Sequence, residues 1–227
     1  MQKFLDWLER VLTPLAKVIG ENKYLVAIRD GFLLSTPLLI VGSVFLLIAN
    51  FPLPQWDTWM SHLLGKDWAT MMSVPASASF DVMTILAVVG IAYSLGKQFN
   101  VDAMQAGIIA LVSFFIVTPY QTLFTPENSS KVYEVTSLPL KWMGSSGLFL
   151  GMIVALIATR LFVAIVRKGW TIKMPEGVPP TVVKSFEALI PSFLVVTLMF
   201  LVNWLAALTP YGNLQDVIFE FLQTPLL

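Results

Sequence analysis

The apolar residues of this chain lie in blocks that are too long for the strands of a soluble protein. A membrane-spanning helix needs about 20 mostly apolar residues. Four blocks with long uncharged stretches predict spans at residues 28–50, 103–124, 142–166 and 184–208. The pattern therefore predicts an all-α integral membrane protein.

A fifth span is predicted over residues 78–97, where apolar side chains must outweigh one carboxylate. Its Leu, Ile, Phe and Val residues contribute about −2.5 to −5 kcal/mol to insertion, and an aspartate at the bilayer centre costs about +3 kcal/mol. Asp81 lies at the end of the segment, where this cost is smaller. We therefore expect about five transmembrane helices in a domain covering residues 24–210.

The basic residues predict the direction of the chain through the membrane. With five spans and a cytoplasmic N-terminus, most Lys and Arg residues fall on the inner side, as the positive-inside rule requires. Without the 78–97 span, the basic cluster from Arg167 to Lys184 would face outward. The sequence thus predicts a multi-pass protein of the bacterial inner membrane with its N-terminus in the cytoplasm.

Two segments are expected to lie along the membrane surface rather than cross it. Residues 1–20 carry apolar side chains at helical spacing with charges between them, which predicts a cytoplasmic interfacial helix or a helix docked on the bundle. Residues 211–227 carry a shorter apolar stripe and are expected to begin an interfacial helix that leads to a further domain. On this expectation the chain is a fragment.

Composition limits the chemistry of the chain. Hydrophobic residues make up 56% and charged residues 12%, the mean hydropathy is +0.77, and the 14 basic and 14 acidic residues cancel. No net charge attracts nucleic acid. There is no cysteine and only one histidine, His62, so thiolate and all-histidine metal sites within one chain are excluded. Gly144 to Gly147 lacks the lysine of a nucleotide-binding loop. We expect no cofactor, no metal and no catalytic site.

Several short motifs occur in one order along the whole chain. They are GENKYLVAIRDGF at 20–32, PLLIVGS at 37–43, VTPY at 117–120, IKMP at 172–175, SFEALIPSF at 185–193 and TPL at 224–226. In this set and order the chain resembles the enzyme IIC permeases of the phosphotransferase system (PTS), in the lactose, cellobiose and diacetylchitobiose branch.

The resemblance implies a homodimeric permease that carries a disaccharide inward for phosphorylation by enzyme IIB. Enzyme IIB in turn receives its phosphoryl group from enzyme IIA. Family members are about twice this length. Their first half carries much of the dimer contact, and their second half carries the sugar site with a histidine and a glutamate. No residue here matches those two, and His62 lies in the first outer loop. The resemblance therefore implies an N-terminal scaffold half and does not identify the sugar.

Four basic residues near the predicted inner face are candidate functional residues. Arg167, Lys168 and Lys173 could contact enzyme IIB or gate the inner side, or they could set topology and bind lipid headgroups. Arg160 lies about one and a half turns inside its span and can extend its charge to the interface. Both interpretations stay open.

Three polar residues in or beside the spans complete the candidates. Asp81 could cap the start of its helix, Glu187 could pair with Lys184 three residues before it, and Asn203 could bond across helices at a dimer face. Four glycines are expected to permit close helix packing: Gly42, Gly90, Gly107 and Gly151.

The sequence therefore predicts the scaffold and dimerisation half of a sugar-transporting enzyme IIC. Two alternatives stay open. The chain could be a self-sufficient small transporter or channel that uses its intramembrane polar residues, or a membrane scaffold that transports nothing.

Overall fold

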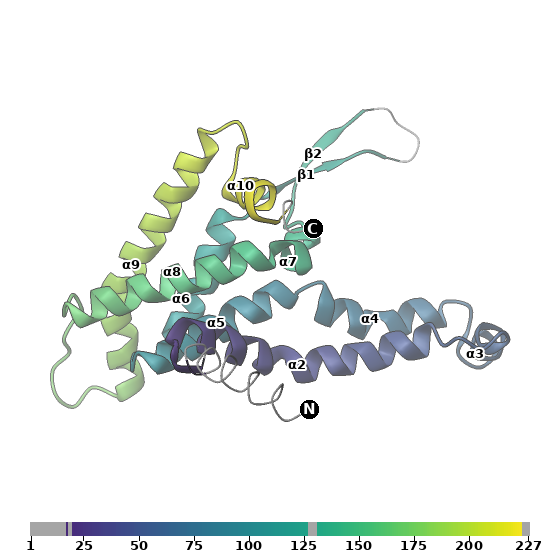
Figure 1. The fold of residues 1–227 in the computed structure, drawn as a ribbon, viewed down its shortest axis with the longest axis horizontal. Helices are drawn as coiled ribbons and strands as arrows, with labels where there is room; N and C mark the ends of the chain where they lie inside the picture. Colours follow the sequence, from purple (N-terminus) through teal and green to yellow (C-terminus); the bar gives the residue numbers. More distant parts are fainter. Residues whose placement is uncertain (1–16, 18–19, 127–130, 224–227) are drawn as a thin grey trace, which may run out of the picture.

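The computed structural model describes residue 17, residues 20–126 and residues 131–223, and it is almost entirely helical (Figure 1). Four helical segments are long and apolar enough to cross a membrane: Lys23–Ala49, Trp68–Gln98, Ser145–Arg167 and Pro180–Ala207. A shorter apolar helix, Ala103–Val117, lies among them. The predicted all-α membrane fold is confirmed. The segment 1–20, predicted as an amphipathic helix, lies mostly outside the described residues.

The first long helix, α2 (Lys23–Ala49), begins at a polar cap. The side chain of Asn22 accepts hydrogen bonds from the backbone N–H groups of Tyr24 and Leu25, at 2.9 and 3.3 Å. Such a cap satisfies donors that the first turn leaves free. Helix α2 then runs beside α4 (Trp68–Phe80) and α5 (Met83–Gln98), with α3 (Trp56–Leu64) at the far tip (Figure 1).

The segment that contains the predicted 78–97 span is longer than the prediction. Helices α4 and α5 form one apolar stretch that is interrupted only at Asp81 and Val82. Trp68 is buried at the start of α4, and its Nε1 donates to Asp57 on α3 at 3.0 Å. The protein itself thus supplies the hydrogen-bond partner that a buried indole N–H needs.

The predicted 103–124 span is wrong at its C-terminal end. Helix α6 (Ala103–Val117) stops at Thr118, which has extended backbone angles and precedes Pro119. Proline restricts the residue before it to extended conformations and has no N–H for the helix. Strand β1 (Gln121–Phe124) follows and pairs antiparallel with β2 (Tyr133–Thr136) in a hairpin that projects from the bundle (Figure 1).

The second half of the chain closes the bundle. After the hairpin come the short α7 (Leu140–Met143) and a 3-10 turn (Ser145–Gly147), which lead into α8 (Leu148–Arg167). Helix α9 (Pro180–Ala207) follows a turn-rich segment. The chain then returns through α10 (Leu214–Ile218) and a π-helical turn (Phe219–Gln223).

The core lies between α5, α6, α8 and α9. Its buried residues include Ile91, Phe114, Val154 and Val195, each below 2% exposed. The start of the predicted C-terminal interfacial helix packs on this core, because Leu214 and Ile218 contact it and the Phe219 ring lies 5.7 Å from Trp142. Residues 224–227 lie outside the described residues.

Candidate functional site

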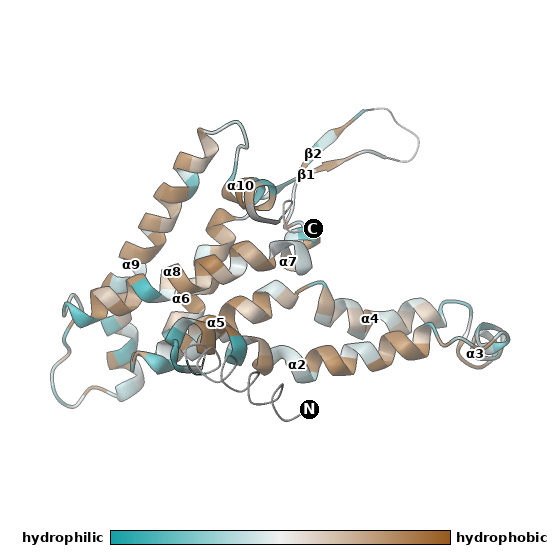
Figure 2. Ribbon diagram, viewed as in Figure 1, coloured by the Kyte–Doolittle hydropathy of each residue, from teal (hydrophilic) through white to brown (hydrophobic). Residues whose placement is uncertain are grey.

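Most of the charged side chains lie at one end of the bundle. The start of α2, the turn between α5 and α6, the end of α8 and the start of α9 meet there, and hydrophilic residues gather at this end and around α3 (Figure 2). We call it the basic end, after Lys23, Lys97, Arg160, Arg167 and Lys184. These are the helix ends that the predicted alternation of spans assigned to one side.

Three cationic side chains of the basic end lie around one aromatic ring, that of Phe99. Phe99 follows α5, in a tight turn where Asn100 adopts a positive φ of 56° and the Val101 N–H donates to the Gly96 carbonyl. Three cationic groups lie around its ring: Lys23 Nζ at 4.9 Å from the centroid, Arg160 Cζ at 5.0 Å and Arg167 Cζ at 5.3 Å. We call these four residues the Phe99 cluster.

Each cation of the Phe99 cluster is also fixed by one hydrogen bond. Lys23 Nζ donates to the Gln98 carbonyl at 3.2 Å, and Arg167 Nη2 donates to the Phe99 carbonyl at 3.2 Å. Arg160 Nε donates to the Tyr24 hydroxyl at 3.0 Å. The structure thus brings two of the candidate residues, Arg160 and Arg167, into one site formed by α2, α5 and α8.

The other two basic candidates lie outside the Phe99 cluster. Lys168 caps α8, and its Nζ lies 5.2 Å from the centroid of the Trp170 ring. Lys173 is exposed in the segment between α8 and α9. Both remain candidates for contact with a partner or with lipid headgroups.

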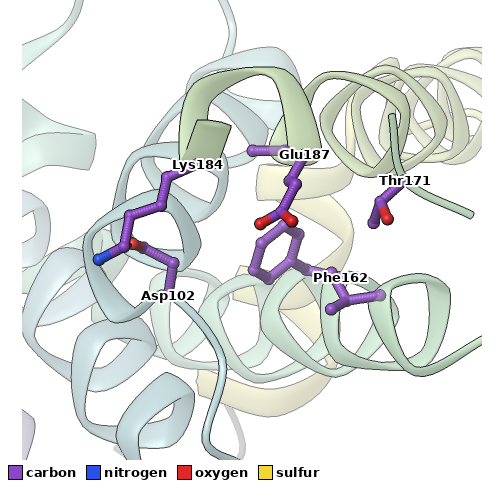
Figure 3. A pocket seen from close by; sticks show the side chains of 7 residues that line it. Asp102, Phe162, Thr171, Lys184 and Glu187 are labelled. Atoms are coloured by element: carbon purple, nitrogen blue, oxygen red, sulfur yellow. The ribbon is translucent and has the colours of Figure 1, made fainter. Parts of the chain in front are cut away.

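Glu187 lines a small pocket beside the Phe99 cluster. Figure 3 shows Lys184 turned toward Asp102, while the carboxylate of Glu187 lies over the Phe162 ring. The expected pairing of Glu187 with Lys184 is wrong, because Lys184 Nζ lies 3.2 Å from Asp102 Oδ2 in the turn before α6. A partner on a neighbouring helix thus replaces the local one.

Asp102 is held in its charged form. Burial raises its pKa, but hydrogen bonds from the Gln105 backbone N–H and from Lys184 outweigh burial and lower the pKa below its usual value. The carboxylate also caps α6, because its Oδ1 lies 3.0 Å from the Gln105 nitrogen. The pair therefore ties the start of α9 to the start of α6.

The pocket itself is too small for a disaccharide. Its volume is about 140 Å³, whereas ligand pockets usually range from about 300 to 1,000 Å³. Among the described residues there is also no group of three metal-ligating side chains. We therefore interpret Asp102, Lys184 and Glu187 as structural at this position.

Asp81 lies away from the basic end, where the chain passes from α4 to α5. The expected helix-capping role of Asp81 is wrong: it is the C-cap of α4, and Val82 is the N-cap residue of α5. Asp81 lines an open polar pocket of about 470 Å³ together with Lys141, Ser145 and Ser146.

Asn203 lies half-buried on α9. Its Oδ1 is buried and accepts no hydrogen bond from the described residues. Two further buried oxygens, of Thr159 and Gln215, share this condition. A buried acceptor without a donor costs free energy.

Sequence reasoning did not predict Phe99, Tyr24 or Asp102 as site residues. The predicted topology already placed Lys23, Arg160 and Arg167 on one side, so a shared cluster could have been inferred. No residue pattern distinguished the aromatic residue at its centre.

The fold defines a multi-pass membrane protein, and comparison with known proteins supplies its family. The family model described as "Phosphotransferase system, EIIC" matches residues 29–226. The chain is 39% identical over its whole length to the cellobiose-specific EIIC component of Geobacillus stearothermophilus, covering 50% of that protein. It is 40% identical to the lichenan permease IIC component of Bacillus subtilis, again over 100% of this chain and 50% of the relative.

A solved structure agrees with these relatives. The crystal structure of ChbC, the IIC component of the N,N'-diacetylchitobiose-specific phosphotransferase system, superposes with a TM-score of 0.91 at 41% identity. The match covers 97% of this chain and 51% of ChbC. The chain therefore belongs to the EIIC family of the phosphotransferase system, and it spans about half the length of the relatives it matches.

Proposed function

We propose that this chain is the scaffold and dimer-forming half of an EIIC permease that carries a β-linked disaccharide across the inner membrane. The observation that carries the proposal is the 0.91 TM-score to about half of ChbC, together with relatives named for cellobiose and lichenan. The sugar would be bound by the half that this chain does not align with, and phosphorylated EIIB would supply the phosphoryl group.

The distribution of apolar surface supports a scaffold role. Helices α2 and α9 expose large side chains along their lengths, including Leu33, Ile40, Phe193 and Trp204, each above 50% exposed. Lipid can cover such surfaces, and so can a second copy of the chain. A second copy would cover the apolar residues of α9, the helix that also carries the half-buried polar residue Asn203. We therefore place the homodimer contact along α9.

The orientation follows from the basic end. Because cytoplasmic ends of membrane helices carry the excess of Lys and Arg, we assign the basic end to the cytoplasm and the β-hairpin to the outer side. Lys168 and Lys173 then face the compartment that contains EIIB. In this orientation the basic end also lies at the depth of the lipid headgroups.

The transport proposal is tested by uptake in a strain that lacks its own permease. The complete EIIC reading frame, expressed with EIIB and EIIA, should take up cellobiose or diacetylchitobiose, and omission of EIIB should abolish accumulation of the phosphorylated sugar. Uptake by the 227-residue chain alone in liposomes would instead support a self-sufficient transporter. A complete reading frame inactive on every β-linked disaccharide would contradict the proposal.

The dimer contact is tested separately by disulfide crosslinking. Because the chain has no cysteine of its own, only the introduced cysteines can form a disulfide. Cysteines introduced at Trp204 on α9 should crosslink two copies in native membranes. Cysteines at Leu63 on α3, which is 76% exposed, serve as the matched control and should not. Crosslinking at Leu63 alone would place the interface elsewhere.

A further inference from the structure

We propose that Lys23, Arg160 and Arg167 form a binding site for the phosphate of an anionic phospholipid at the basic end of the bundle. The inference rests on the proposed placement of this chain in a membrane, and it does not depend on sugar transport. The argument begins with the charge of the Phe99 cluster.

Three cations are held close together in the Phe99 cluster. Each charged group lies within 5.3 Å of one ring centroid, so no two of them are more than about 10 Å apart, which is about one Debye length at 0.1 M salt. Within the described part of the chain, the ion pairs shorter than 4 Å join other residues: Lys17 with Glu21, Arg29 with Asp30, and Lys184 with Asp102. The positive potential of the cluster therefore favours an anion.

The three cations are positioned in advance and still have donors to offer. Each makes one hydrogen bond to the protein, which fixes its place. An arginine has five N–H donors and a lysine has three. All three side chains belong to exposed residues, so the remaining donors can reach a ligand. Guanidinium groups bind phosphate oxygens in pairs.

The surroundings of the cluster favour a lipid over a free anion. Ile157, one turn before Arg160 on the same face of α8, is 47% exposed. Leu25, which follows Tyr24 on α2, is 42% exposed. Tyr24, whose hydroxyl binds Arg160, has the apolar body and polar tip typical of a membrane interface. A phosphate with acyl chains attached satisfies both the charges and the apolar surface beside them.

The test is lipid binding by the purified 227-residue chain in detergent, followed by native mass spectrometry. Phosphatidylglycerol should bind at least tenfold more tightly than phosphatidylcholine with the same acyl chains. The double variant Arg160→Gln with Arg167→Gln should bind phosphatidylglycerol about 30-fold more weakly, since each basic residue contributes about 1 kcal/mol to attraction of anionic lipid. Its affinity for phosphatidylcholine should not change.

The matched control is Lys168→Gln with Lys173→Gln, which removes the same charge from the same end but outside the Phe99 cluster. It should bind phosphatidylglycerol several-fold more tightly than the Arg160 and Arg167 variant, because neither lysine lies at the Phe99 ring. Equal losses in both double variants would mean that general surface charge binds the lipid, and would overturn the site. Retention by the Arg160 and Arg167 variant would overturn it as well.

If the double variant does not fold, Arg167→Gln alone and Phe99→Leu replace it in the lipid-binding test. Phe99→Leu should bind about threefold more weakly, because a cation–π contact at an exposed site contributes about 0.5–1 kcal/mol.

Two further measurements distinguish a lipid site from a free-anion site and from a protein contact. Inorganic phosphate should displace the lipid only at tens of millimolar, and displacement below one millimolar would overturn the lipid assignment. Full lipid binding by the double variant, combined with lost EIIB-dependent uptake in the complete permease, would assign the cluster to a protein partner instead.

Discussion

Helices α2 and α5 lie side by side, yet they use their side chains in opposite ways. Helix α5 has 16 residues, nine of which are buried, including Val88, Ile91 and Leu95. Helix α2 has 27 residues and buries only four, Ala27, Gly31, Ser35 and Gly42. Its large side chains, such as Leu33 and Ile40, are each 59% exposed.

The difference shows how a bilayer changes the rule for burial. In water, large apolar side chains turn inward because exposure to water costs free energy. In a bilayer the lipid tails are as apolar as leucine, so helices associate through close packing of small residues. Helix α2 turns its small residues to the protein and its large ones outward, whereas α5, surrounded by α2, α6 and α8, buries both kinds.

The closest approach of the two helices is made by a pair of glycines, one on each helix. A Cβ atom at Gly31 would clash with the backbone nitrogen of Ile91, and a Cβ atom at Gly90 would lie 2.6 Å from the Gly31 carbonyl oxygen. These atoms belong to the backbone and cannot rotate away. A side chain at either position must therefore separate the helices.

The largest expected effect is that of Gly31→Ala. Overpacking in a tight interface costs about 1–3 kcal/mol and sometimes more, and here the obstacle is backbone, so we expect a loss at or above the upper end. The free energy of unfolding in mixed detergent micelles measures this loss. A variant as stable as the original chain would mean that close packing does not hold α2 to α5.

Two substitutions serve as controls for the same comparison. Gly107→Ala adds a Cβ that meets only Val89, at 3.4 Å, and alanine in place of glycine favours a helix by about 0.5–1 kcal/mol. It should be neutral or stabilising, although the sequence predicted a tight contact there as at Gly42, Gly90 and Gly151. Leu33→Ala on the exposed face of α2 should change stability by less than about 0.5 kcal/mol.

The next effect concerns a polar contact inside the well-packed region. Thr84 on α5 is fully buried, and its hydroxyl donates to the Gly144 carbonyl at 2.6 Å. Thr84→Val keeps the shape but removes this hydrogen bond, which should cost about 0.5–1.5 kcal/mol, because the carbonyl still accepts from the Gly147 N–H at 3.2 Å. Thr84→Ser keeps the donor and should cost less. Equal stability of both variants by the same unfolding measurement would show that the hydrogen bond contributes little.

Much of the membrane architecture could be predicted because it follows from one-dimensional signals. Long apolar blocks and the side preference of basic residues predicted the helices and their alternation. The hairpin was missed because Leu123 and Phe124 are as apolar as the span before them. Pro119 was the only local sign that α6 ends early. Most of α4 was missed because Asp81 was taken to mark the end of a span. Asp81 instead lies between two helices of one apolar stretch.

The sites were harder to predict than the fold because they depend on which helices become neighbours. Arg160 and Arg167 were chosen from their positions, but their shared ring, Phe99, lies in a turn that has no periodic pattern. Lys184 had an acceptable local partner in Glu187, three residues away. Only the packing of α9 against α6 brings Asp102 closer. Such choices between a local and a distant partner cannot be read from spacing alone.

The smallest expected effect is a pH dependence at the Asp102–Lys184 pair, which joins the start of α9 to the start of α6 and includes no residue of α2. Because the pKa of Asp102 is lowered in the folded chain, its ionisation stabilises the fold above the unfolded pKa of about 4, and this contribution is lost as pH falls through the lower folded pKa. Asp102→Asn keeps an N-cap but removes the charge, so it should cost no more than about 1 kcal/mol at pH 7, as expected for a partly exposed pair. Asp102→Ala also removes the cap and should cost about 1 kcal/mol more.

The difference in unfolding free energy between the original chain and Asp102→Asn should be constant from pH 8 to about pH 5 and should shrink below about pH 4. Lys184→Gln, with the carboxylate intact, should show a weaker version of the same dependence, because the Gln105 N–H still stabilises the charged form. A difference that grows as the pH falls would have the wrong sign for a lowered pKa. It would mean that burial, rather than the two hydrogen bonds, governs this carboxylate and the contact between α6 and α9.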